Sequence, residues 1–318
     1  MKKTNKHLHN KIVFLSSLIF VLSISVGCGK PARKEIYTEK LLIKGKVGSG
    51  DGELLWKKLE DAITYGPTSY AIDSNGSIWI VDVLNNRIQG FDSTGHYLFQ
   101  FVPEDPRNIH DITISKDLIY ILYYKPKILI YNLQGQLLRE LTIGKEGYKG
   151  GLIRVDEKGY IFIEHPDIDD YVIKLYLPKE NIVKEENVVK GLFDLDYWVE
   201  TEGNYYVRVW RSGLVGRREP YLCNMEGDSI LCIKKYKGFT VIGMDGEKNI
   251  YAITERGEDY YNFLKISPNG KILTEFNMRS GFCGPECHSH IVDKKGNVYV
   301  LDGDVDKFFL WKYELTKR

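Results

Sequence analysis

Several residues able to do chemistry lie together in the segment CGPECHSH, which holds Cys283, Cys287, His288 and His290. Thiolates and imidazoles bind zinc, and a cysteine pair followed by histidine is how haem is attached. The spacing suits neither use, because Cys283 and Cys287 are too far apart for the common haem motif, and a zinc site normally takes two separate Cys or His pairs. Since the glycines and Pro285 indicate a loop, we expect a disulfide-closed loop, with a reduced pair as the alternative.

A second cysteine pair, Cys223 and Cys232, flanks the segment NMEGDSIL, which carries a turn signal at its centre. A hairpin at this turn could place the two cysteines opposite one another, so a cross-strand disulfide is predicted, again with reduced thiols as the alternative. The glycine-containing turns join β-rich runs and do not lead into helices. Nucleophile elbows, P-loops and dinucleotide fingerprints are therefore excluded, and we expect no cofactor.

The amino terminus has the features of an export signal. Four lysines precede an apolar stretch at residues 12–26, which is short for a spanning helix. Its end, Ser-Val-Gly before Cys28, resembles the lipobox of bacterial lipoproteins. The resemblance implies that residues 1–27 are removed as a signal peptide and that Cys28 is the lipid attachment site. A plain signal peptide or an uncleaved anchor is the alternative.

Residues 28–39 are polar and lack periodicity, as expected for a tether between a lipid and a folded domain. The protein is therefore predicted to lie in the cell envelope, lipid-anchored and outside the cytoplasm. Gly29 stands where some lipoproteins have the Asp that marks retention in the inner membrane. This favours the outer membrane if the organism has one.

The rest of the chain repeats one pattern. Residues 67–102 contain four short β-rich runs, YAID, SIWIVD, RIQGFD and YLFQFV, separated by turn signals. Apolar residues alternate within these runs, which excludes a helical repeat. The pattern recurs, with decay, in residues 111–144, 152–189, 192–236, 241–277 and from residue 288 onward. Each repeat predicts a four-stranded antiparallel meander, as in one propeller blade.

The first repeat resembles an NHL repeat. Asp82, Asn86 and Arg87 occupy that family's Asp-x-x-x-Asn-Arg positions, and GSGDGE at residues 48–53 matches its inter-blade loop. The resemblance implies an all-β, six-bladed β-propeller over residues 40–318, with a structural role for these three side chains. The last repeat has only three runs, so residues 40–47 are predicted to supply its fourth strand and close the ring.

Aligned on their first strands, the repeats place Thr68, His110 and His288 at one position, where the innermost strand begins. Such positions surround the channel mouth of a propeller, so Thr68, His110, Asp111, His288 and His290 are candidate ligand contacts. Some NHL-like enzymes, such as the lyase that completes peptide amidation, bind metal through histidines at comparable positions. A catalytic zinc usually has three protein ligands, and two histidines reach that number only with Asp111 or His290. The metal stays unknown, and no catalytic residue is assigned.

Charge and composition narrow the function further. The 318 residues include 44 Lys and Arg against 43 Asp and Glu, a net charge of +1, which argues against nucleic acid as a partner. The expected function is a monomeric, membrane-anchored binding or scaffold module for a protein, peptide or glycan. The alternatives are a metal-dependent enzyme of lyase or lactonase type with its site at the channel mouth, and a purely structural envelope component.

Overall fold

The computed structural model describes residues 35–58, 64–125, 127–143, 152–156, 159–164, 172–176, 184–187, 196–199, 205–212, 218–223, 229–233, 235–236, 239–255, 260–281 and 289–317. The predicted signal peptide and Cys28 lie outside this part of the chain, as do Cys283, Cys287 and His288. Residues Glu35–Arg318 form one compact unit. Among the described residues, no helix is long and apolar enough to cross a membrane.

The described strands form six four-stranded antiparallel sheets and one two-stranded sheet. The first two sheets are β4 (Ser69–Ile72), β5 (Ile78–Asp82), β6 (Arg87–Phe91) and β7 (Tyr97–Phe101), then β8 (Ile109–Ser115), β9 (Leu118–Tyr123), β10 (Lys127–Asn132) and β11 (Leu137–Thr142). The next two are β12 (Ile153–Val155), β13 (Ile161–Glu164), β14 (Val172–Tyr176) and β15 (Lys184–Asn187), then β16 (Asp196–Val199), β17 (Tyr205–Ser212), β18 (Arg218–Cys223) and β19 (Ser229–Cys232). The fifth is β20 (Thr240–Met244), β21 (Ile250–Glu255), β22 (Tyr260–Ile266) and β23 (Ile272–Arg279).

The sheet at the carboxyl end takes a strand from the other end of the unit. It contains β24 (His290–Val292), β25 (Val298–Gly303), β26 (Lys307–Lys317) and β1 (Glu35–Lys46). β1 pairs antiparallel with β26 along its whole length, from Glu35 opposite Lys317 to Lys46 opposite Lys307. The predicted domain limit is therefore corrected: residues 35–39, assigned to the tether, belong to the strand, because their backbone groups pair with β26.

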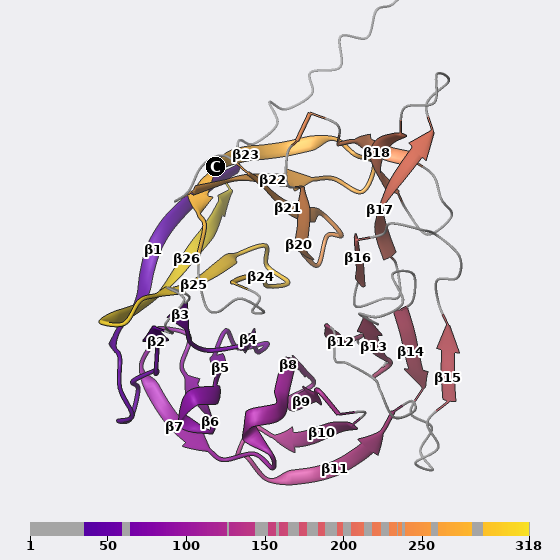
Figure 1. The fold of residues 1–318 in the computed structure, drawn as a ribbon. Coiled ribbons are helices and arrows are strands. Elements are labelled where there is room, and N and C mark those ends of the chain that lie inside the picture. The colour runs from indigo at the N-terminus through magenta and orange to yellow at the C-terminus, as the bar shows by residue number, and fades with distance from the viewer. Residues whose placement is uncertain are drawn as a thin grey trace, which may run out of the picture. The chain divides into compact units, whose positions relative to one another are not determined.

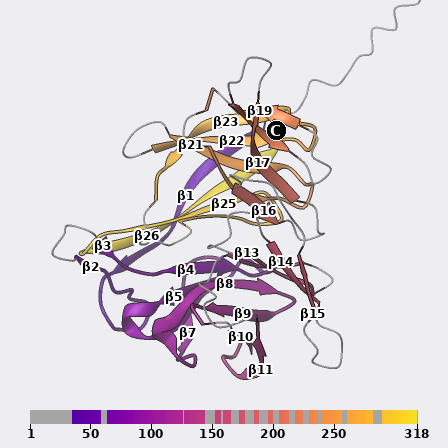
Figure 2. The same cartoon turned by 45° about the vertical axis from the view of Figure 1, so that its right-hand side comes forward.

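The molecule is an all-β propeller of four-stranded antiparallel sheets. Figure 1 shows the sheets surrounding a common centre, with β4, β8, β12, β16, β20 and β24 nearest to it. Figure 2 shows how one sheet extends outward, from β8 through β9 and β10 to β11. Each sheet corresponds to one sequence repeat, since consecutive strands joined by short turns pair with one another.

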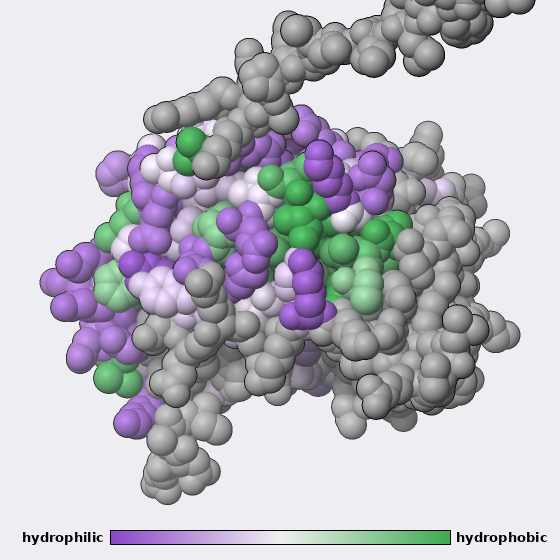
Figure 3. Space-filling model, turned by 90° about the horizontal axis from the view of Figure 1, so that it is seen from above, coloured by the Kyte–Doolittle hydropathy of each residue, from purple (hydrophilic) through white to green (hydrophobic). Residues whose placement is uncertain are grey.

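Burial follows from position within a sheet. All residues of β5 are buried, because a second strand packs against neighbouring sheets on both faces, whereas the outer strand β7 alternates between intermediate and exposed residues. Hydrophobic clusters fill the spaces between adjacent sheets. Figure 3 views the molecule from above, where hydrophobic residues gather near the centre of the view and hydrophilic residues border them. Leu273 of the outer strand β23 is exposed.

The first and last sheets share a core. Trp56 and Tyr70 pack in one cluster with Phe308 and Leu310, and the rings of Trp56 and Phe308 stack with centroids 5.8 Å apart. The Tyr70 hydroxyl donates to the Tyr299 carbonyl oxygen at 2.9 Å. Residues far apart in sequence thus meet in this core.

The inner strands end in a recurring turn. In three sheets, an Asp at the end of the strand accepts backbone N–H groups two and four residues later at 2.8 to 2.9 Å; these residues are Asp73, Asp245 and Asp293. The residue before the last donor has positive φ, and it is Gly76, Lys248 or Gly296. Because Asp bonds nearby amides and Gly tolerates this backbone, the sequence specifies the turn locally.

Candidate functional site

A cavity of about 980 Å³ lies along the inner strands. Its lining comes from β4, β8, β12, β20 and β24 and from the turns that follow them. We call the end of each inner strand that leads into these turns the turn end. The opposite end, where each inner strand begins, is called the leading end. A concave space bordered by several sheets is the usual setting for a ligand.

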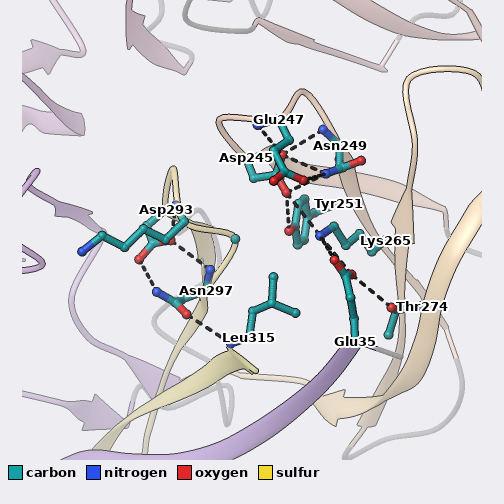
Figure 4. A network of polar contacts seen from close by, with 12 residues as sticks. Glu35, Asp245, Glu247, Asn249, Tyr251, Lys265, Thr274, Asp293, Asn297 and Leu315 are labelled. Carbon is teal, nitrogen blue, oxygen red and sulfur yellow. Dashed lines mark hydrogen bonds and ion pairs between the residues drawn. The ribbon is translucent and has the colours of Figure 1, made fainter. Parts of the chain in front are cut away.

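Two aspartates of the cavity lining, Asp245 and Asp293, are engaged in their own turns. Asp245 accepts the hydroxyl of Tyr251 at 2.8 Å and the side-chain amide of Asn249 at 2.9 Å, besides the turn amides (Figure 4). Asp293 accepts the side-chain amide of Asn297 at 2.8 Å. Their carboxylates stabilise the turns and are not poised as an acid and base pair.

The turn that contains Asp245 rests on a buried ion pair. Lys265 of β22 is fully buried, and its Nζ lies 3.0 Å from Glu35 of β1 and 3.4 Å from Asp245 (Figure 4). Tyr37 donates to Tyr251 at 3.3 Å, and burial raises the pKa of Tyr251 above its usual range, so this phenol stays protonated. The cluster joins β1 to the fifth sheet and leaves no group facing the cavity for acid–base chemistry.

Asp111 joins three consecutive sheets near the leading end. Its Oδ1 accepts the Ser69 hydroxyl at 2.6 Å, while its Oδ2 accepts the Ile153 N–H at 2.9 Å and lies 3.2 Å from the Arg154 guanidinium. The side chain is 2% exposed. A buried carboxyl group with this many donors acts as a structural link between sheets, because burying it without them would cost several kcal/mol.

His290 is buried and hydrogen-bonded through both ring nitrogens. Its Nε2 lies 3.1 Å from the Arg279 carbonyl oxygen, which can only accept, so Nε2 carries the proton. Nδ1 then accepts the Ser289 hydroxyl at 2.7 Å. Burial lowers the pKa of His290 to about 4, so the ring is neutral at pH 7. Neither nitrogen is open to a metal in this arrangement.

Two further predicted contacts, Thr68 and His110, each keep a polar atom without a partner. Thr68 is 8% exposed and its Oγ1 has no hydrogen-bond partner in the described part of the chain, and the same holds for the buried Nδ1 of His110. The His110 ring packs edge-on against Tyr124, with centroids 4.7 Å apart. Their role as ligand contacts stays a prediction.

The predicted site residues are therefore only partly brought together. Asp111 lines the cavity, whereas Thr68, His110 and His290 do not, and His288 lies outside the described residues. Across the residues that the structure describes, no group of three His, Cys, Asp or Glu side chains could hold a metal ion. The cavity at the turn end was not predicted from the sequence, although the repeated Asp and Gly turns lie in its lining.

The NHL-like residues of the first sheet hold a loop. Asp82 and Arg87 form a buried ion pair of 2.9 Å, and the Arg87 guanidinium also donates to the Ser49, Gly50 and Glu53 carbonyl oxygens. These are the contacts that the segment at residues 48–53 needs, since loop carbonyls must be satisfied. Asn86 takes the left-handed conformation that ends the short 3-10 helix at Val83–Asn85.

The predicted cross-strand disulfide is not formed in the structure. Cys232 is a free, exposed thiol. In the β18–β19 register it lies opposite Tyr221, while Cys223 pairs with Ser229, because the register shifts between Leu222 and Cys223. The partner of Cys232 in this register is thus two residues away from Cys223 along β18, so the two cysteines do not face one another. The predicted disulfide between Cys283 and Cys287 lies outside the described residues.

Comparisons with known proteins agree on the architecture alone. No protein-family profile and no curated protein matches the chain. Among solved structures, it is similar to a member of the DUF4221 family from Bacteroides vulgatus, at 12% identity and a TM-score of 0.54, over 90% of this chain and 100% of that one. It is also similar to a catalytically inactive virginiamycin B lyase from Staphylococcus aureus with quinupristin, at 13% identity and a TM-score of 0.50, over 81% of this chain and 98% of that one. At such identities the likeness shows the fold.

Proposed function

We propose that this protein is a lipid-anchored, extracytoplasmic β-propeller that binds a ligand in its central cavity. In this proposal its sheets are six NHL-type blades, and β1 closes them into one ring. The lipobox-like sequence before Cys28 supports the anchor, and the pairing of β1 with β26 supports the closure.

The cavity of about 980 Å³ carries the proposal. Its size matches that of pockets for small ligands or chain ends, which range from roughly 300 to 1,000 Å³. The polar groups best suited to catalysis are engaged instead in structural contacts, as for Asp111 and His290. Binding without turnover is therefore favoured over the metal-dependent enzyme.

Filling the cavity tests the proposal. Ile114 of β8 and Val292 of β24 line it from two walls, and both are partly buried. The compact unit Glu35–Arg318 contains all described strands, so it can be produced without the signal segment. The immobilised unit should retain a component of an envelope extract that either Ile114→Trp or Val292→Trp fails to retain.

The matched control is Leu273→Trp on the outer strand β23, which is 41% exposed and outside the cavity lining. It should retain the component as the unmodified unit does. Equal retention by both cavity variants, with folding confirmed by thermal unfolding, would rule out the cavity as the binding site. Retention of nothing by any form would contradict the binding function itself.

The anchor has its own test. In the full chain, Cys28→Ser should abolish incorporation of radiolabelled palmitate and release the protein from membranes, because the thiol is the acylated group in this proposal. Labelling that persists in the variant would contradict lipid attachment at Cys28.

A further inference from the structure

The turns at the rim of the cavity carry exposed lysines. Lys116 stands at the tip of the turn between β8 and β9, and Lys294 and Lys295 stand in the turn between β24 and β25; all three line the cavity. In the part of the chain that the structure describes, Lys116 and Lys295 have no ion pair. Asp117 beside Lys116 is an exposed carboxylate of this rim, and so is Glu314 of β26, which lies 3.2 Å from Lys312.

The other acidic residues of the lining do not offset these ammonium groups locally. Asp73 and Asp293 each accept two turn amides, Asp245 also faces Lys265, and Asp111 faces Arg154. Hydrogen bonds and cations on the protein side thus compensate the carboxylates. Glu314 is paired with Lys312, so the rim that a ligand meets is positive, because Lys116, Lys294 and Lys295 outnumber the remaining exposed carboxylate, Asp117.

The rim is also held in place by contacts between turns. The Gly246 N–H donates to the Lys294 carbonyl oxygen at 2.9 Å, which ties the turns of the fifth and last sheets. The Ser115 hydroxyl bonds the Asp156 carbonyl oxygen at 3.4 Å, between the second and third sheets. A rim fixed in this way loses little conformational freedom when it binds.

Below the rim, the walls of the cavity are largely apolar. The side chains concerned come from five inner strands and are partly or fully buried; they are Ile72, Ile112, Ile114, Val155, Met244, Ile291 and Val292. Apolar walls favour an apolar group, which leaves water on entering. The positive rim lies where an attached charge would remain close to solvent.

We propose that the cavity takes a ligand with an apolar body and an anionic group, such as a carboxylate, sulfonate or phosphate, and that Lys116 and Lys295 hold the anionic group. This inference rests on the proposed binding function and names the chemical class of its ligand. An apolar body inserted between the inner strands would bring its anionic end to the turn tips, where the two ammonium groups lie.

A matched pair of fluorescent probes tests the inference on the unit Glu35–Arg318. Anilinonaphthalene sulfonate is the anionic probe, and phenylnaphthylamine has the same apolar body without the sulfonate. The anionic probe should bind more tightly, and rising salt should weaken its binding because exposed charges are screened. The double variant Lys116→Gln/Lys295→Gln should weaken it about fivefold, since two exposed ion contacts are removed, and leave the neutral probe unchanged.

The control double variant is Lys57→Gln/Lys58→Gln, in the exposed strand β2 (Lys57–Lys58), which makes the same change in net charge outside the cavity lining. It should not alter binding of either probe. One outcome would overturn the anionic preference: both probes bind equally, and the rim variant Lys116→Gln/Lys295→Gln has no effect. If Ile114→Trp and Val292→Trp still abolish binding in that case, the cavity remains a binding site. If neither cavity variant affects either probe, the proposed binding function fails with it.

Discussion

At the turn ends of the inner strands one local structure recurs, whereas at the leading ends each strand has contacts of its own. Asp73, Asp245 and Asp293 bond amides two and four residues away. Asp111 and His290, nearer the leading ends, bond groups in other sheets or in a neighbouring strand. Similar polar residues are therefore used for short-range turn formation at one end and for long-range assembly at the other.

The two ends differ in how many of their side chains could be exchanged to suit a ligand. In the turn of the last sheet, Asp293 accepts the turn amides and Gly296 has the positive φ, so the side chain of Lys295 has no part in forming the turn. Lys116 lies in a two-residue turn in which its own backbone has positive φ, and its side chain is exposed. Nearer the leading ends, Asp111 and His290 are already committed to contacts with other sheets. Loop tips on a rigid scaffold are the usual place for binding residues, which agrees with the position of the cavity.

The largest expected effect is a loss of stability on removing the contacts between sheets near the leading end. Asp111→Ala removes the acceptor of Ser69, Ile153 and Arg154 together, so the free energy of unfolding should fall by about 3–5 kcal/mol. Denaturant unfolding measures the change. Asp306→Ala, at an exposed aspartate outside these contacts, is the control and should stay within about 0.5 kcal/mol. Equal effects would show that Asp111 is not a link between sheets.

His290 should make stability depend on pH. The unfolded ring has a pKa near 6.5 and the folded ring near 4, so the unfolded state binds the proton first as the pH falls. The free energy of unfolding should therefore drop by up to about 3 kcal/mol between pH 7 and pH 4 on account of this residue. In His290→Asn this part of the pH dependence should be missing.

The exposed His96, whose side chain is 83% exposed, supplies the control. His96→Asn should leave the dependence of the unfolding free energy on pH as it is in the unmodified protein. If the two variants change that dependence equally, burial does not hold the His290 ring neutral.

A smaller expected effect distinguishes two causes of destabilisation at the turn ends, which are backbone strain at a position with positive φ and steric overlap with a neighbouring side chain. Gly159 and Gly296 both have positive φ, but a Cβ at Gly159 meets nothing within 4 Å, whereas at Gly296 it would overlap the buried Tyr251 hydroxyl. Gly159→Ala should cost about 1 kcal/mol for the backbone alone. Gly296→Ala should cost about 2 kcal/mol more, because Tyr251 is fully buried. Thermal unfolding of both variants measures the difference, and equal losses would contradict close packing between the turn and Tyr251.

Less of the candidate site than of the fold could be predicted from the sequence. The register of the repeats located the inner strands, because each begins and ends at a recognisable turn. It could not show that Asp111 bonds Ser69 and Ile153, since those contacts join different repeats. Nor could it show that Cys232 lies opposite Tyr221, because the pairing register of β18 and β19 is decided by how the two strands pack, and a turn signal between two cysteines does not fix it.

The sequence by itself determined the all-β class, the four-stranded antiparallel repeats and the Asp turns, since alternation and turn chemistry act over a few residues. Only the tertiary structure decided which polar groups face the cavity. The charges of Asp245 and Lys265 come together from separate strands, and Glu35 reaches them from the other end of the unit. Such ion pairs form only when distant strands pack against one another. The packing of the sheets therefore decides which charged side chains are paired and which lysines remain exposed at the rim.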